Sequence, residues 1–390
     1  ATRMQYKHCE ATRLQSSILV RTIMSALAAF MLAVPMGISA QPTTAQGYGF
    51  KIFRAEEGLY PFVQVFMRTF DEQMNPLVNL NDRNIGVMVK GKPYAPAKRQ
   101  YMIQNVKSRG DAVRAVFVLD TSESMAGAPF EAALKASTRF IDAKRSQDQV
   151  AILALNDSSD GYDVVSDFER DPAALARRMA DLEADGQKTR LYDGIAAAFQ
   201  MSGMAGQGGI SMQDADYIAS NSVIVFSDGQ DDGSSLSRGD LMNRMSGMEL
   251  PIPIYSLAYS KTDPSRLRNL EALSKNSFGK FYDVQESVDQ MTQSVEDIHN
   301  ILQNDYVVTF RSYIPVDGNL HRAKVGVEYP SGSGRMRYQN ATFEAIQPPQ
   351  LEPINEARKQ LDERLNKLDD GNPYTQGGDE FMPQGDQGEG

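Results

Sequence analysis

Cysteine, histidine and tryptophan are the residues that this sequence has least of. Its 390 residues contain one cysteine, three histidines and no tryptophan. The cysteine, Cys9, lies in an N-terminal stretch with the features of an export signal, so the mature chain is predicted to have neither disulfides nor thiol chemistry. Only His299 and His321 lie beyond that stretch, which makes a histidine-ligated zinc site or a Ser-His-Asp triad hard to assemble.

The first forty residues have the parts of a secretory signal peptide. Basic residues precede an uncharged stretch, Thr22 to Gly49, whose apolar part ends at Pro35 and is followed by small residues up to Ala40. This order is typical of a signal peptide (residues 1–40) that is cleaved after Ala40. The alternative is an uncleaved anchor, because Thr22 to Ala40 is nearly long enough to span a bilayer. Both interpretations predict that the remainder is secreted, periplasmic or exposed at the cell surface.

Positive charge is also scarce in the remainder of the chain. The formal net charge is −10, and since the first forty residues carry +3, the rest carries −13. An acidic exported protein is a poor candidate for binding nucleic acid or anionic lipid. We therefore expect no nucleic-acid partner, and membrane attachment only if the N-terminal segment is retained.

The central part of the chain, residues 111–303, alternates strand and helix patterns. Arg114 to Asp120 is an apolar run typical of a buried strand, a helix is expected over Pro129 to Lys144, and Gln149 to Leu155 is the next strand, with Val164 to Phe168 as its hairpin partner. Met201 to Ala219 reads as an insertion at the end of the sheet away from the site described next. Alternating βα units predict an α/β fold with a doubly wound, mostly parallel sheet.

Oxygen-bearing side chains follow the strands of this unit. Asp120, Ser122 and Ser124 come directly after the first strand, Thr189 lies in a loop that leads into a helix, and Asp228 follows a second apolar strand. The carboxyl ends of parallel strands meet at one edge of a sheet, where ligands bind. Carboxylates and hydroxyls suit Mg²⁺ or Mn²⁺ rather than zinc. Each residue alone is equally explained as a helix cap or a turn residue.

Taken together, these residues resemble a known motif. The chain has a pattern similar to the metal-ion-dependent adhesion site of von Willebrand factor type A (VWA) domains: Asp120-x-Ser122-x-Ser124, then Thr189, then Asp228-Gly229. The resemblance implies a doubly wound, Rossmann-like fold for about half the chain. It also implies that the five side chains hold Mg²⁺, or Mn²⁺ or Ca²⁺ in its place, and that an Asp or Glu carboxylate of a partner protein completes the metal's ligands.

Two flanking regions, residues 59–110 and 304–346, carry short β-strand patterns with turn signals between them. We expect them to combine into one immunoglobulin-like β-sandwich into which the central unit is inserted; two separate β-modules are the alternative. Residues 41–58 are expected to form a linker. Residues 350–369 are expected to form a helix lying on the sandwich or a short coiled-coil seam, and residues 370–390 to be disordered.

Three classes of function are compatible with these features. A non-enzymatic, metal-dependent protein-binding or adhesion module is favoured, and a cell-envelope scaffold whose metal is structural or dispensable is the alternative. An enzyme with Ser122 or Ser124 as nucleophile requires a base, and neither histidine is near these serines in sequence. We expect His299 to be exposed and His321 to lack a partner.

Five further aspartates are expected in loops near the metal rim. There they could select a partner with basic residues around its carboxylate, although solvated loop charges are the simpler explanation. They are Asp157, Asp160, Asp163, Asp231 and Asp232.

Overall fold

The structure is a computed structural model that describes residues 47–206, 218–248, 251–260, 263–284, 287 and 289–365. The predictions for residues 1–40 and 370–390, and for most of the insertion between Met201 and Ala219, lie outside these residues. In the part of the chain that is described, every helix is too short or too polar to cross a bilayer.

The apolar run that ends at Asp120 forms β6 (Ala112–Asp120), a central strand of a six-stranded sheet. The strand order is β11-β10-β9-β6-β7-β8, and only the β7–β8 pair is antiparallel. The expected mostly parallel sheet and its hairpin are therefore confirmed. The other strands are β7 (Gln149–Leu155), β8 (Tyr162–Glu169), β9 (Ile218–Ser227), β10 (Ile254–Ala258) and β11 (Phe281–Asp283).

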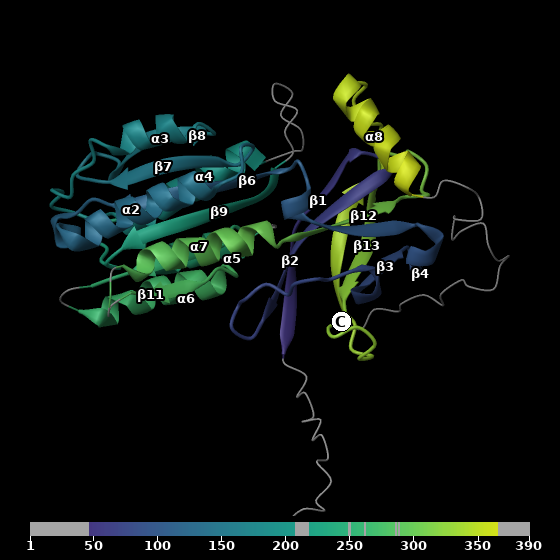
Figure 1. Ribbon diagram of the computed structural model, residues 1–390, viewed down its shortest axis with the longest axis horizontal. Coiled ribbons are helices and arrows are strands. Elements are labelled where there is room, and N and C mark those ends of the chain that lie inside the picture. Colours follow the sequence, from purple (N-terminus) through teal and green to yellow (C-terminus); the bar gives the residue numbers. More distant parts are fainter. Residues whose placement is uncertain are drawn as a thin grey trace, which may run out of the picture. The chain divides into compact units, whose positions relative to one another are not determined.

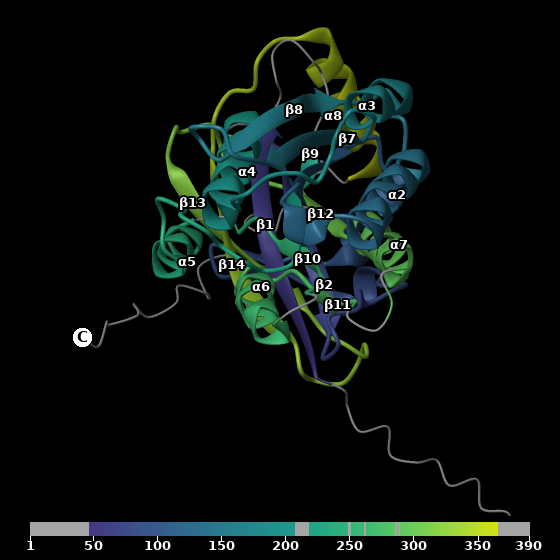
Figure 2. The same ribbon diagram turned by 90° about the vertical axis from the view of Figure 1, so that its left-hand side faces the viewer.

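Helices cover both faces of this sheet (Figure 2). Phe117 and Leu119 of β6 pack with α2, α3 and α7, whereas Val116 and Val118 pack with α4, α5 and α6. A strand that is buried on both faces appears in the sequence as a continuous apolar run, because every side chain packs against a helix. The helices are α2 (Ala128–Ala143), α3 (Pro172–Met179), α4 (Leu191–Gly206), α5 (Arg238–Ser246), α6 (Leu267–Asn276) and α7 (Gln290–Gln303).

The two flanking regions form two antiparallel sheets (Figure 1). Their strand orders are β1-β2-β12-β5 and β14-β13-β3-β4. Each sheet contains strands from before and after the central unit, and one hydrophobic core contains side chains of both sheets, such as Val65 and Val325. An immunoglobulin-like topology stays a prediction. The strands are β1 (Tyr48–Leu59), β2 (Phe62–Asp71), β3 (Ile85–Val89), β4 (Lys92–Pro93), β5 (Tyr101–Asn105), β12 (Tyr306–Arg311), β13 (Leu320–Val327) and β14 (Arg337–Glu344).

The expected linker over residues 41–58 is wrong for most of its described part, which belongs to β1. The glycines of this stretch suggested a flexible segment, but Gly49 lies where a Cβ atom would be 2.5 Å from the ring of Phe70 on the paired strand. A larger residue at position 49 would force the Phe70 ring to shift, so glycine lets this ring pack closely against the paired strand. Phe50, the next residue, is buried in the shared core.

The C-terminal helix α8 (Glu352–Arg364) falls within the expected range 350–369. Its buried side chains Ile354 and Leu361 pack against Leu59 and Phe62 of the first antiparallel sheet. The apolar stripe of this helix therefore serves intramolecular packing, as expected for a helix that lies on the β-sheets rather than for a coiled-coil seam.

Glu57, near the end of β1, provides a pH-dependent prediction. Burial, followed by the nearby carboxylates Glu56 and Glu344, raises the pKa of Glu57 to about 7. Since the ionised form is disfavoured only in the folded state, stability is expected to fall as pH rises from about 4.5 through 7. Glu57→Gln should therefore stabilise the chain at pH 8 by roughly 1–2 kcal/mol, allowing for the partial exposure of the side chain.

Urea unfolding of both proteins at pH 5 and pH 8 measures this difference. Most of the gain should appear only at the higher pH. An equal gain at both pH values would mean that the effect comes from packing rather than from ionisation.

Candidate metal site

The structure brings the predicted ligand residues together at the carboxyl edge of the parallel sheet. Asp120 is the last residue of β6, and Asp228 directly follows β9, the neighbouring strand in the sheet. The Thr189 hydroxyl lies 3.5 Å from Asp120 Oδ1, and the Oγ atoms of Ser122 and Ser124 are 2.9 Å apart. The three loops that carry these residues therefore meet at one edge of the sheet, as expected.

Two neighbouring carboxylates are buried at this point. Asp120 is 1% exposed and Asp228 is 3% exposed. Burial raises the pKa of Asp120, hydrogen bonds from Ser122 and Ser227 oppose that rise, and the Asp228 charge adds to it. None of the ion pairs between described residues involves either carboxylate. Buried carboxylates without a basic partner are costly, so this pair favours a bound cation.

Ser227 is a member of the site that sequence reasoning missed. Its hydroxyl donates to Asp120 Oδ2 at 2.7 Å and accepts from the Gly229 N–H at 3.1 Å. It thereby links the carboxylate on β6 to the turn that carries Asp228. The residue stands in the Ser-Asp-Gly turn, but a serine at a strand end is too common to be singled out from sequence alone.

The donor set fits a hard divalent cation. In the described chain, no group of three or more His, Cys, Asp and Glu side chains could hold a metal, so any site here depends on hydroxyl oxygens as well. Two carboxylates with serine and threonine hydroxyls match the oxygen preference of Mg²⁺ and Mn²⁺. Ser122 and Thr189 are buried whereas Ser124 is exposed, which places the solvent-facing side of the cluster at Ser124.

Backbone contacts hold the loops of Ser122 and Thr189 side by side. The Glu123 N–H donates to Gly186 O at 2.8 Å, and the Gly186 N–H donates to Thr121 O at 3.1 Å. A Cβ atom on Gly186 would lie 3.2 Å from that same Thr121 oxygen, so the approach leaves little room for a side chain. The Asp157 carboxylate accepts from the N–H of Lys188 at 2.8 Å and so braces the same loop.

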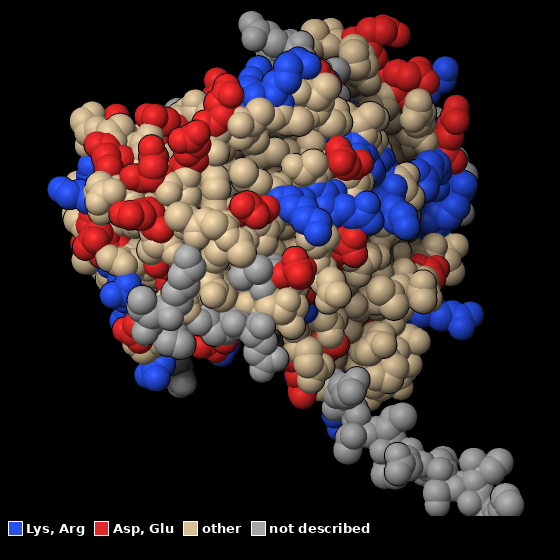
Figure 3. Space-filling model, turned by 60° about the vertical axis from the view of Figure 1, so that its left-hand side comes forward, with Lys and Arg blue, Asp and Glu red and all other residues tan. Residues whose placement is uncertain are grey.

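Several of the aspartates expected near the metal rim accept hydrogen bonds from within the chain. Asp157 accepts from the Lys188 N–H, Asp231 from the Tyr192 N–H in the first turn of α4, and Asp163 from the Asn156 side chain. Asp157, Asp160, Asp163 and Asp232 are exposed, and Asp232 also accepts from Gln230 Nε2 at 2.8 Å. Figure 3 shows many Asp and Glu side chains on the left of the view and a band of Lys and Arg to the right.

The two histidines have partners away from the site, which corrects both expectations. His299 is half-buried with its ring 5.8 Å from that of Phe140, and burial lowers its pKa. It lines a small cavity with Val113, which lies about 20 Å along β6 from Asp120. His321 Nε2 lies 3.0 Å from the Asp317 carboxylate. Neither histidine is among the described hydrogen-bond partners of the motif serines.

Comparison with known proteins finds a family model that matches part of the chain. The model of the von Willebrand factor type A domain matches residues 115–230. The crystal structure of the SpRpn10 VWA domain is 17% identical, with a TM-score of 0.35, and the match covers 48% of this chain and 94% of that one. No curated protein matches the sequence.

A second solved structure contains three N-terminal domains of the type V pili tip protein Mfa5 from Porphyromonas gingivalis. It is 15% identical, with a TM-score of 0.26, and the match covers 48% of this chain and 27% of that chain. All five predicted ligand residues fall within the span of the family model.

Proposed function

We propose that this chain binds a partner protein through a divalent cation, since residues 115–230 match the model of the VWA domain, a kind of domain that commonly mediates protein–protein interaction. The observation that carries the proposal is the buried pair Asp120 and Asp228, which has no basic partner among the described residues, beside three hydroxyls and open to solvent at Ser124. The residues that would hold Mg²⁺, or Mn²⁺ or Ca²⁺, are Asp120, Ser122, Ser124, Thr189 and Asp228.

The charge of this donor set explains why a partner would be needed. Two carboxylates at most neutralise a divalent ion, and neutral hydroxyls add no further charge. A cation held there supplies an electrophilic position that a carboxylate can occupy. We propose that an Asp or Glu side chain of the partner takes that position.

The surroundings of the site suggest the setting of this carboxylate. The loops that carry the site residues expose Glu123, Asp185 and Asp232, beside one exposed lysine, Lys188. Such a rim favours a partner carboxylate that lies among basic residues, since like charges across an interface oppose association. We further propose that the chain is exported and is not an enzyme.

Manganese offers a direct test of the open position. Bound Mn²⁺ that retains exchangeable water strongly relaxes the water protons, and this enhancement should fall when sodium acetate is added to the full chain. Acetamide, which has the same shape without the charge, is the matched control. Thr189→Ala should weaken Mn²⁺ binding while leaving the fold intact.

Two results would contradict the proposal. If Mn²⁺ does not bind to the wild-type chain, there is no metal site of this kind. If it binds but acetate and acetamide act alike, the metal has no position for a carboxylate, and the scaffold with a structural metal becomes the better explanation.

A further inference from the structure

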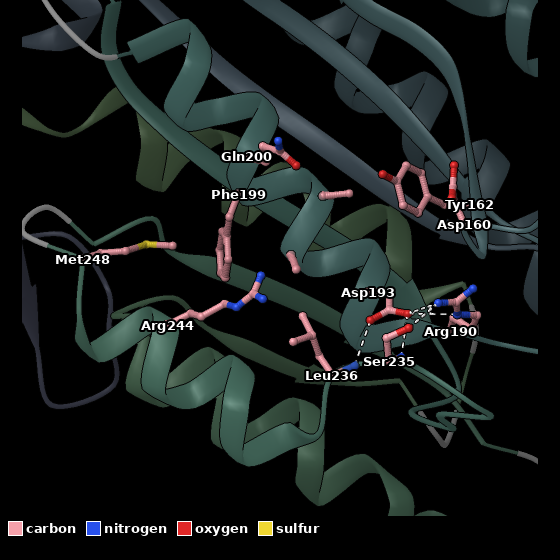
Figure 4. A pocket seen from close by; sticks show the side chains of 12 residues that line it. Asp160, Tyr162, Arg190, Asp193, Phe199, Gln200, Ser235, Leu236, Arg244 and Met248 are labelled. Carbon is pink, nitrogen blue, oxygen red and sulfur yellow. Dashed lines mark hydrogen bonds and ion pairs between the residues drawn. The ribbon is translucent and has the colours of Figure 1, made fainter.

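Arg190 and Asp193 form a partly buried ion pair next to the candidate metal site. Their side chains are 20% and 11% exposed, and Arg190 Nη2 lies 2.6 Å from Asp193 Oδ2. Arg190 directly follows Thr189, and Asp193 lies in the first turn of α4. Figure 4 shows the pair with Ser235 and Leu236 at one end of a cavity of about 580 Å³.

This pair connects three loops. Arg190 Nη1 donates to Ser159 O at 2.6 Å in the β7–β8 loop, and Arg190 Nη2 donates to Ser235 Oγ at 2.7 Å. Asp193 accepts from the N–H of Ser235 at 2.8 Å and from that of Leu236 at 3.1 Å. Both of those residues belong to the loop that begins with Asp228.

Side chains of the Asp228 loop also accept hydrogen bonds from the backbone of α4. Asp231 Oδ1 accepts from the Tyr192 N–H at 3.2 Å, and Ser234 Oγ accepts from the Asp193 N–H at 3.2 Å. The first N–H groups of a helix have no partner within the helix. Here, side chains of the Asp228 loop cap α4, and a side chain of α4 caps that loop.

Electrostatic interactions favour the ionised form of Asp193, which maintains its ion pair with Arg190. Burial opposes the ionised form of Asp193, but the N–H groups of Ser235 and Leu236 and the Arg190 side chain hold its pKa below the usual range. Hydrogen bonds to ionised groups are among the stronger ones in proteins. The ion pair is thus bound from both loops at neutral pH.

We propose that Arg190, Asp193 and Asp231, here called the clasp, are positioning residues that hold Thr189 and Asp228 at the separation that metal binding requires. None of the three is a predicted ligand. The inference rests on the proposed function, because it concerns how well the same metal site is preorganised. Partners of metal ligands orient those ligands, and their loss typically weakens metal affinity by about 10–100-fold.

The experiment is calorimetric titration of the full chain with Mn²⁺, comparing wild type with Asp193→Asn, Arg190→Gln and Arg190→Lys. The first two variants should bind about 10–100-fold more weakly. Arg190→Lys keeps the charge but loses the planar fork that reaches both loops, so it should lie between them and wild type. Asp171→Asn is the matched control because Asp171 caps α3 away from the site; its Mn²⁺ affinity should be unchanged.

Thermal unfolding in EDTA separates positioning from general stability. A structural role alone would lower the unfolding temperature without changing Mn²⁺ affinity in the folded protein. Wild-type affinity in folded Asp193→Asn and Arg190→Gln would overturn the clasp and leave the proposed function standing. Absence of Mn²⁺ binding in wild type would overturn both.

A milder variant covers the case in which Asp193→Asn and Arg190→Gln do not fold. Ser234→Ala removes one hydroxyl that caps α4 and contacts Asp231. A several-fold loss of Mn²⁺ affinity in this variant would support the clasp, and an unchanged affinity would overturn it.

Discussion

The proposed metal site predicts that Mg²⁺ stabilises the wild-type chain and that replacing Asp120 by alanine abolishes this stabilisation. A ligand at one hundred times its dissociation constant stabilises the folded state by about 2.7 kcal/mol, or roughly 5–11 °C for a domain of this size. Asp120 is buried, contacts Ser122 and Ser227, and lies 3.5 Å from Thr189. Removing it takes away a proposed charged ligand and the acceptor that orders the hydroxyls around it. Thermal unfolding with Mg²⁺ and with EDTA measures the loss.

Without metal, in EDTA, removing the charge of Asp120 is expected not to destabilise the folded chain. Because burial and Asp228 raise the pKa of Asp120, its ionised form opposes folding, and stability without metal falls as pH rises through the folded pKa. Asp120→Asn keeps an oxygen acceptor and removes the charge, so it should be at least as stable as wild type in EDTA at pH 7. Asp142→Asn, on the exposed face of α2, should respond to Mg²⁺ like wild type. Strong destabilisation of Asp120→Asn in EDTA would show that the carboxylate is structural.

Arg68→Ala is expected to destabilise the chain by about 3–5 kcal/mol, because it leaves a buried charge without its partner. Arg68 is 2% exposed, and its Nε and Nη2 atoms donate to the two oxygens of Asp305 at 2.7 and 2.6 Å. Its guanidinium also contacts the Tyr255 hydroxyl and lies 4.8 Å from the centre of the Phe53 ring. Urea unfolding of the variant and of wild type measures the loss.

The chain offers a matched exposed pair as a control. Arg139 Nε and Glu296 Oε1 are 2.7 Å apart, but the side chains are 56% and 49% exposed. Arg139→Ala should therefore cost at most about 1 kcal/mol. Replacing both Arg68 and Asp305 by apolar residues should recover part of the loss, since no isolated charge then remains. Equal losses for Arg68→Ala and Arg139→Ala would mean that burial does not govern the strength of these pairs.

Much of the candidate site could be predicted because its residues stand at the ends of strands that are easy to recognise. Asp120 ends an apolar run, Asp228 follows another, and parallel strands end at one edge of a sheet. Local chemistry and a simple topological rule thus place them together. The contacts that Arg190 and Asp193 make between loops could not be foreseen, because they depend on hydrogen bonds to Ser159 and Ser235 in distant loops.

The errors in the fold have similar causes. The glycine that made residues 41–58 look like a linker is explained only by Phe70 on the paired strand. The helix α5 was not foreseen because only Leu241 and Met245 are buried on it. Short amphipathic segments have a weak periodic signal, and tertiary packing decides their structure. His299 was expected to be exposed, and only the approach of Phe140 from α2 shows otherwise.

The position of β12 between β2 and β5 has a consequence for the order in which the chain acquires its structure. Met67 pairs with Tyr306, so the first antiparallel sheet is incomplete until ribosomes have made the whole central unit and the strand after it. Contacts of such long sequence separation form slowly, because loop closure precedes the gain from pairing. A central unit that folds first would shorten the effective loop. We therefore expect nascent chains truncated before residue 306 to expose unpaired strand edges and to require chaperones.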